Sequence, residues 1–187
     1  PKPIADAGAD QAVCVGTSAN LSANASSGMA PYTYSWSNGA TTANTTVSPT
    51  NTTSYTVTVT DSKGCVGTDV VVVTVNPKPN VDLGADVAIC AGDSKSLSAV
   101  VTSGTFPYTY AWSNSGTSAT ISVNPATTTT YAVTVTDSKG CTDVDQVVVT
   151  VNPLPVANAG VDQAICVGAN ANLSASASSG MTPYSYA

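Results

Sequence analysis

Apolar and polar residues alternate along short stretches of this chain, and turn residues separate the stretches. The clearest stretch is 55–60, where Tyr55, Val57 and Val59 would face a core and the threonines between them would face solvent. Residues 32–36 alternate in the same way and end on Trp36. Period-two alternation is typical of half-buried β-strands. Shorter stretches rich in strand-forming residues complete a set of seven, at 4–7, 11–15, 19–23, 45–47 and 70–75.

The whole pattern recurs every 76 residues without a gap. Marker residues recur with it, as in Cys14/Cys90/Cys166, Cys65/Cys141, Trp36/Trp112 and Tyr55/Tyr131. We therefore expect one domain at 1–76, a second at 77–152, and the truncated N-terminal half of a third at 153–187. The third copy would place its tryptophan one position past the last residue, so we expect the chain to be a piece of a longer polypeptide.

Seven short strands without helical periodicity predict an all-β protein made of tandem immunoglobulin-like β-sandwich repeats. Trp36 and Trp112 would lie in the cores, on the third main strand of each sandwich. Tyr55 and Tyr131 would open the strand that carries the corner tyrosine of such folds. No cysteine lies two residues after Tyr55, so the inter-sheet disulfide of antibody domains is not expected.

Composition excludes several classes of function. The sequence has no His, no Arg and no Glu, so few groups could carry general acid–base or nucleophilic catalysis, and we expect no enzymatic activity. The formal net charge is -6, and a basic surface for nucleic acid is missing. No apolar run approaches the ~20 residues that a membrane-spanning helix needs, so we expect no membrane insertion of this segment.

The five cysteines predict disulfides formed in an oxidising compartment, because CxxC spacing and histidine, which would favour zinc, are both missing. Two pairings remain open. One joins Cys14 to Cys65 and Cys90 to Cys141, and leaves Cys166 without a partner. The other joins Cys14 to Cys141. It follows from the sandwich topology, which places Cys14 and Cys65 at opposite ends of one domain, too far apart for a disulfide.

Aspartates that recur in the first two copies are candidate calcium ligands, because hard cations prefer carboxylate and carbonyl oxygens. They are Asp6, Asp10, Asp69, Asp82, Asp86 and Asp145. The alternative is that these are solvated aspartates of turns. No other cofactor is expected.

The aromatic side chains of Tyr32, Tyr34 and Trp36 share one face of a predicted strand. Such a row could form a sugar-binding platform. The alternative is core packing, because sandwiches bury the tryptophan at this position.

Two segments resemble a known family. Residues 31–39 (PYTYSWSNG) and 55–65 (YTVTVTDSKGC) resemble the repeat of SprB-type gliding adhesins of Bacteroidota, and residues 5–14 (ADAGADQAVC) resemble the start of PKD-like domains of the same bacteria. The resemblance implies a PKD-like, Ig-like repeat region of a large, secreted cell-surface protein exported by type IX secretion. It implies roles in adhesion, gliding motility or stalk formation, and brings no catalytic residues.

We therefore expect a structural and adhesive repeat region on the bacterial cell surface that forms a stiff stalk or fibre. Its partners would be neighbouring repeats, other copies in a filament, and a glycan or other surface ligand. The short Pro-Lys-Pro linker at 77–79 favours stiffness, because proline fixes φ. The alternative is that the repeats are spacers or glycan-binding modules of a secreted hydrolase.

Overall fold

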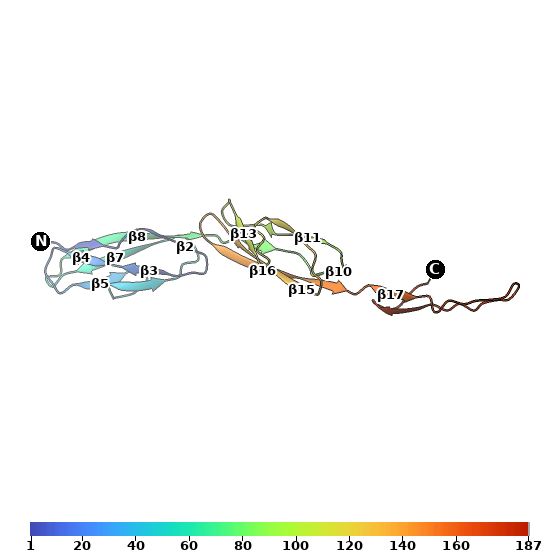
Figure 1. Cartoon of the computed structure of the whole chain (residues 1–187). Coiled ribbons are helices and arrows are strands. Elements are labelled where there is room, and N and C mark those ends of the chain that lie inside the picture. Colours follow the sequence, from blue (N-terminus) through green and yellow to red (C-terminus); the bar gives the residue numbers. More distant parts are fainter. Residues whose placement is uncertain (187) are drawn as a thin grey trace. The chain divides into compact units, whose positions relative to one another are not determined.

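The computed structural model describes residues 1–186, and every regular element in that range is a β-strand (Figure 1). The chain divides into two compact units. The first contains residues 1–80, 101–108 and 135–143, and the second contains the other described residues. The all-β fold predicted from the alternation is confirmed.

The first copy is a sandwich whose larger sheet has the order β2-β8-β7-β5. Its strands are β2 (Gln11–Cys14), β8 (Val66–Asn76), β7 (Thr53–Thr60) and β5 (Thr33–Trp36). Strand β2 runs parallel to β8, with Cys14 opposite Asn76, and the other pairs are antiparallel. The smaller layer pairs β1 (Ile4–Asp6) with β4 (Asn24–Ser26) and β3 (Ala19–Ser22) with β6 (Asn44–Val47).

The stretches expected at 4–7 and 11–15 form strands in different layers. Strand β1 pairs with β4 in one layer, and β2 pairs with β8 in the other. Gly8 lies in the break with φ of 79°, a left-handed conformation that glycine adopts without strain. Its N–H donates to the Asp6 carboxylate at 2.8 Å, which holds the chain at this change of layer.

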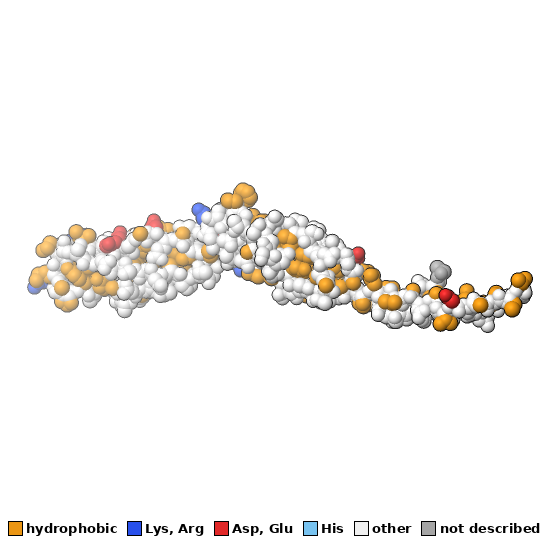
Figure 2. All heavy atoms as spheres, in the orientation of Figure 1, with side chains coloured by type: hydrophobic (Ala, Val, Ile, Leu, Met, Phe, Trp, Pro, Cys, Tyr) orange, Lys and Arg blue, Asp and Glu red, His pale blue; other side chains and the backbone are white. Residues whose placement is uncertain are grey.

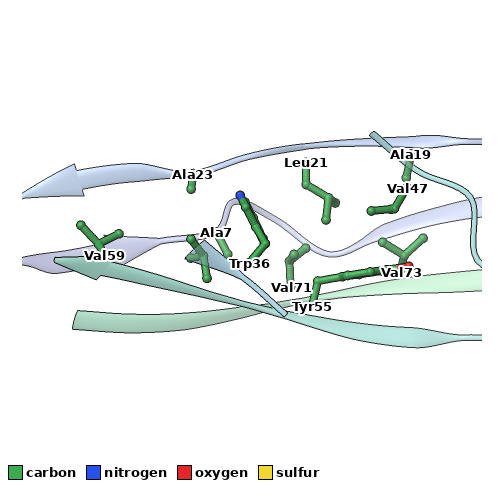
Figure 3. Close-up of a cluster of buried hydrophobic side chains, with 11 residues drawn as sticks. Ala7, Ala19, Leu21, Ala23, Trp36, Val47, Tyr55, Val59, Val71 and Val73 are labelled. Atoms are coloured by element: carbon green, nitrogen blue, oxygen red, sulfur yellow. The ribbon is translucent and has the colours of Figure 1, made fainter. Parts of the chain in front are cut away.

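The core of the first copy lies between the layers (Figure 3). The side chains that alternate inward on β7, those of Tyr55, Val57 and Val59, are buried, and so is Leu21 of β3. Trp36 is 2% exposed, and its indole N–H donates to the carbonyl of Thr42 at 3.0 Å. The indole is therefore buried with its polar atom satisfied, which is the usual condition for a core tryptophan.

The second copy has the same arrangement 76 residues later. Its larger sheet has the order β10-β16-β15-β13, made of β10 (Val87–Cys90), β16 (Thr142–Asn152), β15 (Thr129–Thr136) and β13 (Thr109–Trp112). The smaller layer pairs β9 (Val81–Asp82) with β12 (Val100–Val101) and β11 (Lys95–Ser98) with β14 (Thr120–Val123). Trp112 and Tyr131 are buried like Trp36 and Tyr55 in the first copy.

Residues 153–186 contain one strand pair among the described residues, β17 (Pro155–Asn158) with β18 (Ser176–Ser179). This pair corresponds to β1 with β4 in the first copy. Leu173, which corresponds to Leu21 and Leu97, is 80% exposed, whereas those two are buried. Within 153–186 no second layer covers this side chain.

Candidate functional site

The turn that joins β7 to β8 is organised by Asp61. Its side-chain Oδ1 accepts hydrogen bonds from the backbone N–H groups of Lys63 and Cys65, both at 2.9 Å. Its Oδ2 accepts the N–H of Met29 at 3.2 Å. We call Asp61 with these three donors the first aspartate clamp. It fixes the backbone of Cys65 and ties this turn to the loop that precedes β5.

Asp137 forms the second aspartate clamp, in the turn between β15 and β16. Its Oδ1 accepts the N–H groups of Lys139 and Cys141, and its Oδ2 accepts that of Thr105, all at 2.9 Å. Asp61 and Asp137 are both 5% exposed, and they are the buried charged residues of the described chain. A carboxylate that accepts three backbone hydrogen bonds is satisfied despite its burial.

The clamps keep their carboxylates ionised. Burial of the Asp61 carboxyl group opposes ionisation, but the hydrogen bonds from Cys65, Lys63 and Met29 outweigh it, and its pKa lies below the ordinary value. The same balance between burial and its own three backbone donors lowers the pKa of Asp137.

Cys141, which the second clamp holds, is bonded to Cys14 at the end of β2. The two Cα atoms are 5.6 Å apart, within the range of a disulfide, and the bond spans 127 positions of sequence. Both cysteines belong to the first compact unit, although Cys14 comes from the first sequence copy and Cys141 from the second. The structure thus contains the pairing derived from the sandwich topology, and not Cys14 with Cys65.

The remaining three cysteines, Cys65, Cys90 and Cys166, are free and exposed. A bond between Cys90 and Cys141, which the simpler pairing required, is therefore not formed. Cys65 lies 51 residues from Cys14 in sequence, closer than Cys141 does. In the sandwich, however, Cys65 directly precedes β8, whereas Cys14 is opposite the last residue of that strand.

The six aspartates considered as calcium ligands all accept hydrogen bonds from backbone N–H groups. Asp69 accepts from Ala7 at 2.7 Å, and Asp10 accepts from Val72 at 2.8 Å. The second copy repeats both bonds with Asp145 and Asp86. Asp6 and Asp82 accept from the glycines two residues ahead.

Among residues 1–186, no three His, Cys, Asp or Glu side chains converge where a metal ion could bind. The geometry therefore gives the calcium interpretation no support. It shows the six carboxylates as parts of turns and strand junctions. The hydrogen bond from Ala7 is the largest effect on Asp69, and it lowers the pKa of that carboxyl group.

The aromatic row at 32–36 is divided between the core and the surface. Trp36 is buried in the core, and Tyr32 and Tyr34 are half-buried. The hydroxyl of Tyr32 donates to the carbonyl of Ser27, which fixes the ring against its own loop. The core-packing alternative therefore holds for Trp36.

No motif in the sequence singles out the two clamp aspartates. One signal was available: an aspartate that begins a turn commonly accepts the N–H two residues later. Asp61 does so with Lys63. The bond to Met29 joins residues 32 positions apart, and no local pattern indicates it.

Acid is expected to destabilise the folded copies through the clamps. Because the pKa of Asp61 is lower in the folded chain, its stabilising contribution is complete above the unfolded pKa of about 3.9 and is lost as the pH falls through the folded pKa. Asp61→Asn should therefore lower stability at neutral pH and reduce the further loss between about pH 4 and pH 2. Urea denaturation at stepped pH measures this.

The double variant Asp61→Asn/Asp137→Asn provides the internal comparison, since the two clamps lie in different copies. Its stability should change less between these pH values than that of either single variant. An unchanged pH dependence in the double variant would show that the clamps do not cause the acid sensitivity.

A family model described as the SprB repeat matches residues 9–41. This range contains β2, β3, β4 and β5, and therefore includes Cys14 and Trp36. No curated protein matches the chain. In the part of the chain that the structure describes, no helix is long and apolar enough to cross a membrane.

Solved structures of tandem immunoglobulin domains are similar to this chain. The N-terminal eight Ig domains of Down Syndrome Cell Adhesion Molecule, isoform 1.30.30, align with 12% identity and a TM-score of 0.64, over 96% of this chain and 28% of that one. An I-band fragment of titin aligns with 11% identity and a TM-score of 0.45, over 83% and 67% of the two chains. Domains 3–5 of Drosophila OTK align with 14% identity and a TM-score of 0.44, over 81% and 60%.

At 12% identity the likeness to Down Syndrome Cell Adhesion Molecule shows the fold alone. Together with the family match it agrees with the resemblance noted in the sequence. Residues 9–41 match the SprB repeat, and the chain has the fold of tandem immunoglobulin-like β-sandwich repeats.

Proposed function

We propose that this chain is a non-catalytic, load-bearing spacer in an adhesive protein of the bacterial cell surface. The SprB repeat supports an extracellular, adhesion-type repeat region. Few charged side chains are visible on the face drawn in Figure 2, and they are scattered singly rather than gathered into a binding patch. Buried aromatic residues and hydrogen-bonded carboxylates are features of a scaffold rather than of a catalytic site.

The observation that carries the load-bearing role is the Cys14–Cys141 bond. It closes a covalent loop that contains residues 15–140, which include most strands of both complete copies. Tension applied to the two ends of the chain passes from Cys14 to Cys141 directly, because the disulfide is the shorter covalent path. The strands inside the loop are thereby shielded from the applied force.

The bond also supports the proposal of a stiff stalk. A link that joins β2 of one copy to the β15–β16 turn of the next limits how far the two copies can separate. The linker between the copies contains Pro77 and Pro79, whose fixed φ angles restrict it further. Spacing and stiffness are what a stalk requires when it holds an adhesive tip away from a cell.

Single-molecule stretching of the chain from its two ends tests the proposal. In the oxidised chain the looped residues should not extend. After reduction, the fully stretched length should increase by about 440 Å, which is the contour of 127 residues at about 3.5 Å each. A length that does not change on reduction would contradict the force path.

Cys90→Ser is the matched control. Cys90 occupies the same place in the second copy as Cys14 in the first, but it is unpaired. The stretched length of the Cys90→Ser variant should depend on reduction as that of the parent chain does, whereas Cys14→Ser should show the longer length under both conditions.

A further inference from the structure

The local structure around each cysteine of the Cys14–Cys141 bond recurs elsewhere in this chain, around a cysteine that is free. The half that Cys14 provides is a cysteine at the end of a strand. Cys14 is opposite Asn76 in parallel pairing, the next N–H donates to the Asn76 carbonyl at 2.9 Å, and the Cys14 carbonyl accepts from Thr17 at 3.0 Å. We call this arrangement the strand-end half-site.

The second copy contains the same strand-end half-site at Cys90. Cys90 is opposite Asn152 in parallel pairing, and Ala91 N–H donates to Asn152 at 2.9 Å. The Cys90 carbonyl accepts from Asp93 at 3.0 Å. This backbone geometry agrees with that at Cys14, yet the Cys90 thiol is exposed and free.

The half that Cys141 provides is a cysteine held by an aspartate clamp, which we call the turn half-site. The first copy contains the same site at Cys65. Asp61 binds the Cys65 N–H at 2.9 Å as Asp137 binds that of Cys141, and the Cys65 carbonyl accepts the Asp61 N–H at 3.0 Å. Cys65 is nevertheless free and exposed, whereas the bonded Cys141 is buried.

We propose that Cys65 and Cys90 each form this same disulfide with a further repeat of the same kind, supplied by the same polypeptide or by a second copy of the chain. Each bond joins one half-site of each kind. Cys65 bonds to the cysteine of a strand-end half-site, and Cys90 bonds to the cysteine of a turn half-site. The repeats then form a covalent ladder in which each repeat is bonded to others through both of its cysteines. This inference does not depend on the load-bearing role.

Cys166 occupies the strand-end position of the third copy by sequence. Its carbonyl accepts the N–H of Ala169 at 3.0 Å, as at Cys14 and Cys90. The strand pairing of the other two sites is missing there, because residues 153–186 include no partner strand for it. Cys166 is therefore a weaker strand-end half-site in this chain than Cys90.

The bond forms by thiol–disulfide exchange with a low-molecular-weight disulfide such as oxidised glutathione. The thiolate of one cysteine attacks this reagent, a mixed disulfide forms and one glutathione thiol leaves. The partner cysteine then attacks the mixed disulfide and releases the second glutathione. Two protein thiols lose two protons and two electrons, and the reagent is reduced to two thiols.

Oxidation of the purified chain in a glutathione buffer tests the proposal. At high protein concentration, non-reducing electrophoresis should show a series of multimers, and peptide mapping should find Cys65 joined to Cys90 and, less often, to Cys166. Cys65→Ser should abolish the series. Cys90→Ser/Cys166→Ser should abolish it as well, and all these variants should retain the Cys14–Cys141 peptide.

Moving the thiol within the turn tests whether the position of Cys65 in the clamp is required, or only an exposed cysteine. The variant Cys65→Ser/Ser62→Cys keeps an exposed cysteine in the same turn but removes it from the clamp, and it should not restore the series. Persistent monomers, restoration of the series by the displaced thiol, or Cys65–Cys65 bonds as frequent as Cys65–Cys90 would overturn the proposal. So would a Cys65–Cys90 bond within one chain.

Dilution distinguishes the two sources of the further repeat. Bonds between copies of this chain should disappear as the protein is diluted. A variant that carries residues 77–152 twice in succession should instead bond Cys90 to the turn cysteine of the added repeat at any protein concentration. Failure of this second bond would overturn the ladder while leaving the force path through Cys14 and Cys141 intact.

Discussion

Replacing Trp36 with alanine is expected to lower the free energy of unfolding of the first copy by about 3–5 kcal/mol. The indole is 2% exposed and is the largest side chain of its core cluster. Its removal leaves a cavity between two layers whose strands are fixed by hydrogen bonds, and it leaves the Thr42 carbonyl without its donor. A small domain is stable by about 5–15 kcal/mol, so this loss is a large share.

Urea denaturation followed by tyrosine fluorescence and circular dichroism measures the loss. Trp112→Ala is the matched control, because Trp112 is buried in the second copy and donates to Ser118 as Trp36 donates to Thr42. Each variant should destabilise its own copy, which gives two transitions in place of one. A loss below about 1 kcal/mol for Trp36→Ala would contradict the core position.

The alternation in the sequence predicts the cores well, because burial on a strand depends on a local period. It places Tyr55, Val57 and Val59 inward, and all three are buried. The ends of strands are predicted less well. Strand β8 begins at Val66, whereas the apolar run begins at Val70.

The additional residues of β8 are held by distant parts of the chain. A Cβ on Gly67 would collide with the backbone of Pro3, so this glycine lets the N-terminal segment lie directly against the strand. Asp69 bonds to Ala7, 62 positions away. Such contacts depend on the assembled sandwich, and a sequence pattern of a few residues contains no trace of them.

The disulfide shows what topology adds to spacing. The distances in sequence favour Cys14 with Cys65, and only the opposite directions of the strands in a sandwich argue against that pair. Neither the spacing nor the topology predicts the clamp on Cys141, because Asp137 also accepts a hydrogen bond from Thr105 in a different loop. The strand topology thus indicates that Cys14 pairs with Cys141. The folded turn then shows how Asp137 positions Cys141.

Replacing Cys14 with serine is expected to lower the combined free energy of unfolding of the first two copies by about 5 kcal/mol. The bond spans 127 positions, and closing so long a loop removes about this much chain entropy from the unfolded state. The folded core should not change, because Cys14 lies at the end of β2 and outside the buried cluster. The circular dichroism of the folded variant should therefore equal that of the parent, while its denaturation midpoint falls.

Cys65→Ser and Cys90→Ser are the controls, since both thiols are free and exposed. Neither should change the midpoint, and adding a reductant to the parent chain should reproduce the effect of Cys14→Ser. Cys14→Ser itself should become insensitive to the reductant. A midpoint that falls with Cys65→Ser would instead identify a bond between Cys14 and Cys65, and the sandwich would then be stapled within one copy rather than to the next. The change in denaturation midpoint therefore decides whether Cys14 is bonded within its own copy or to the next copy.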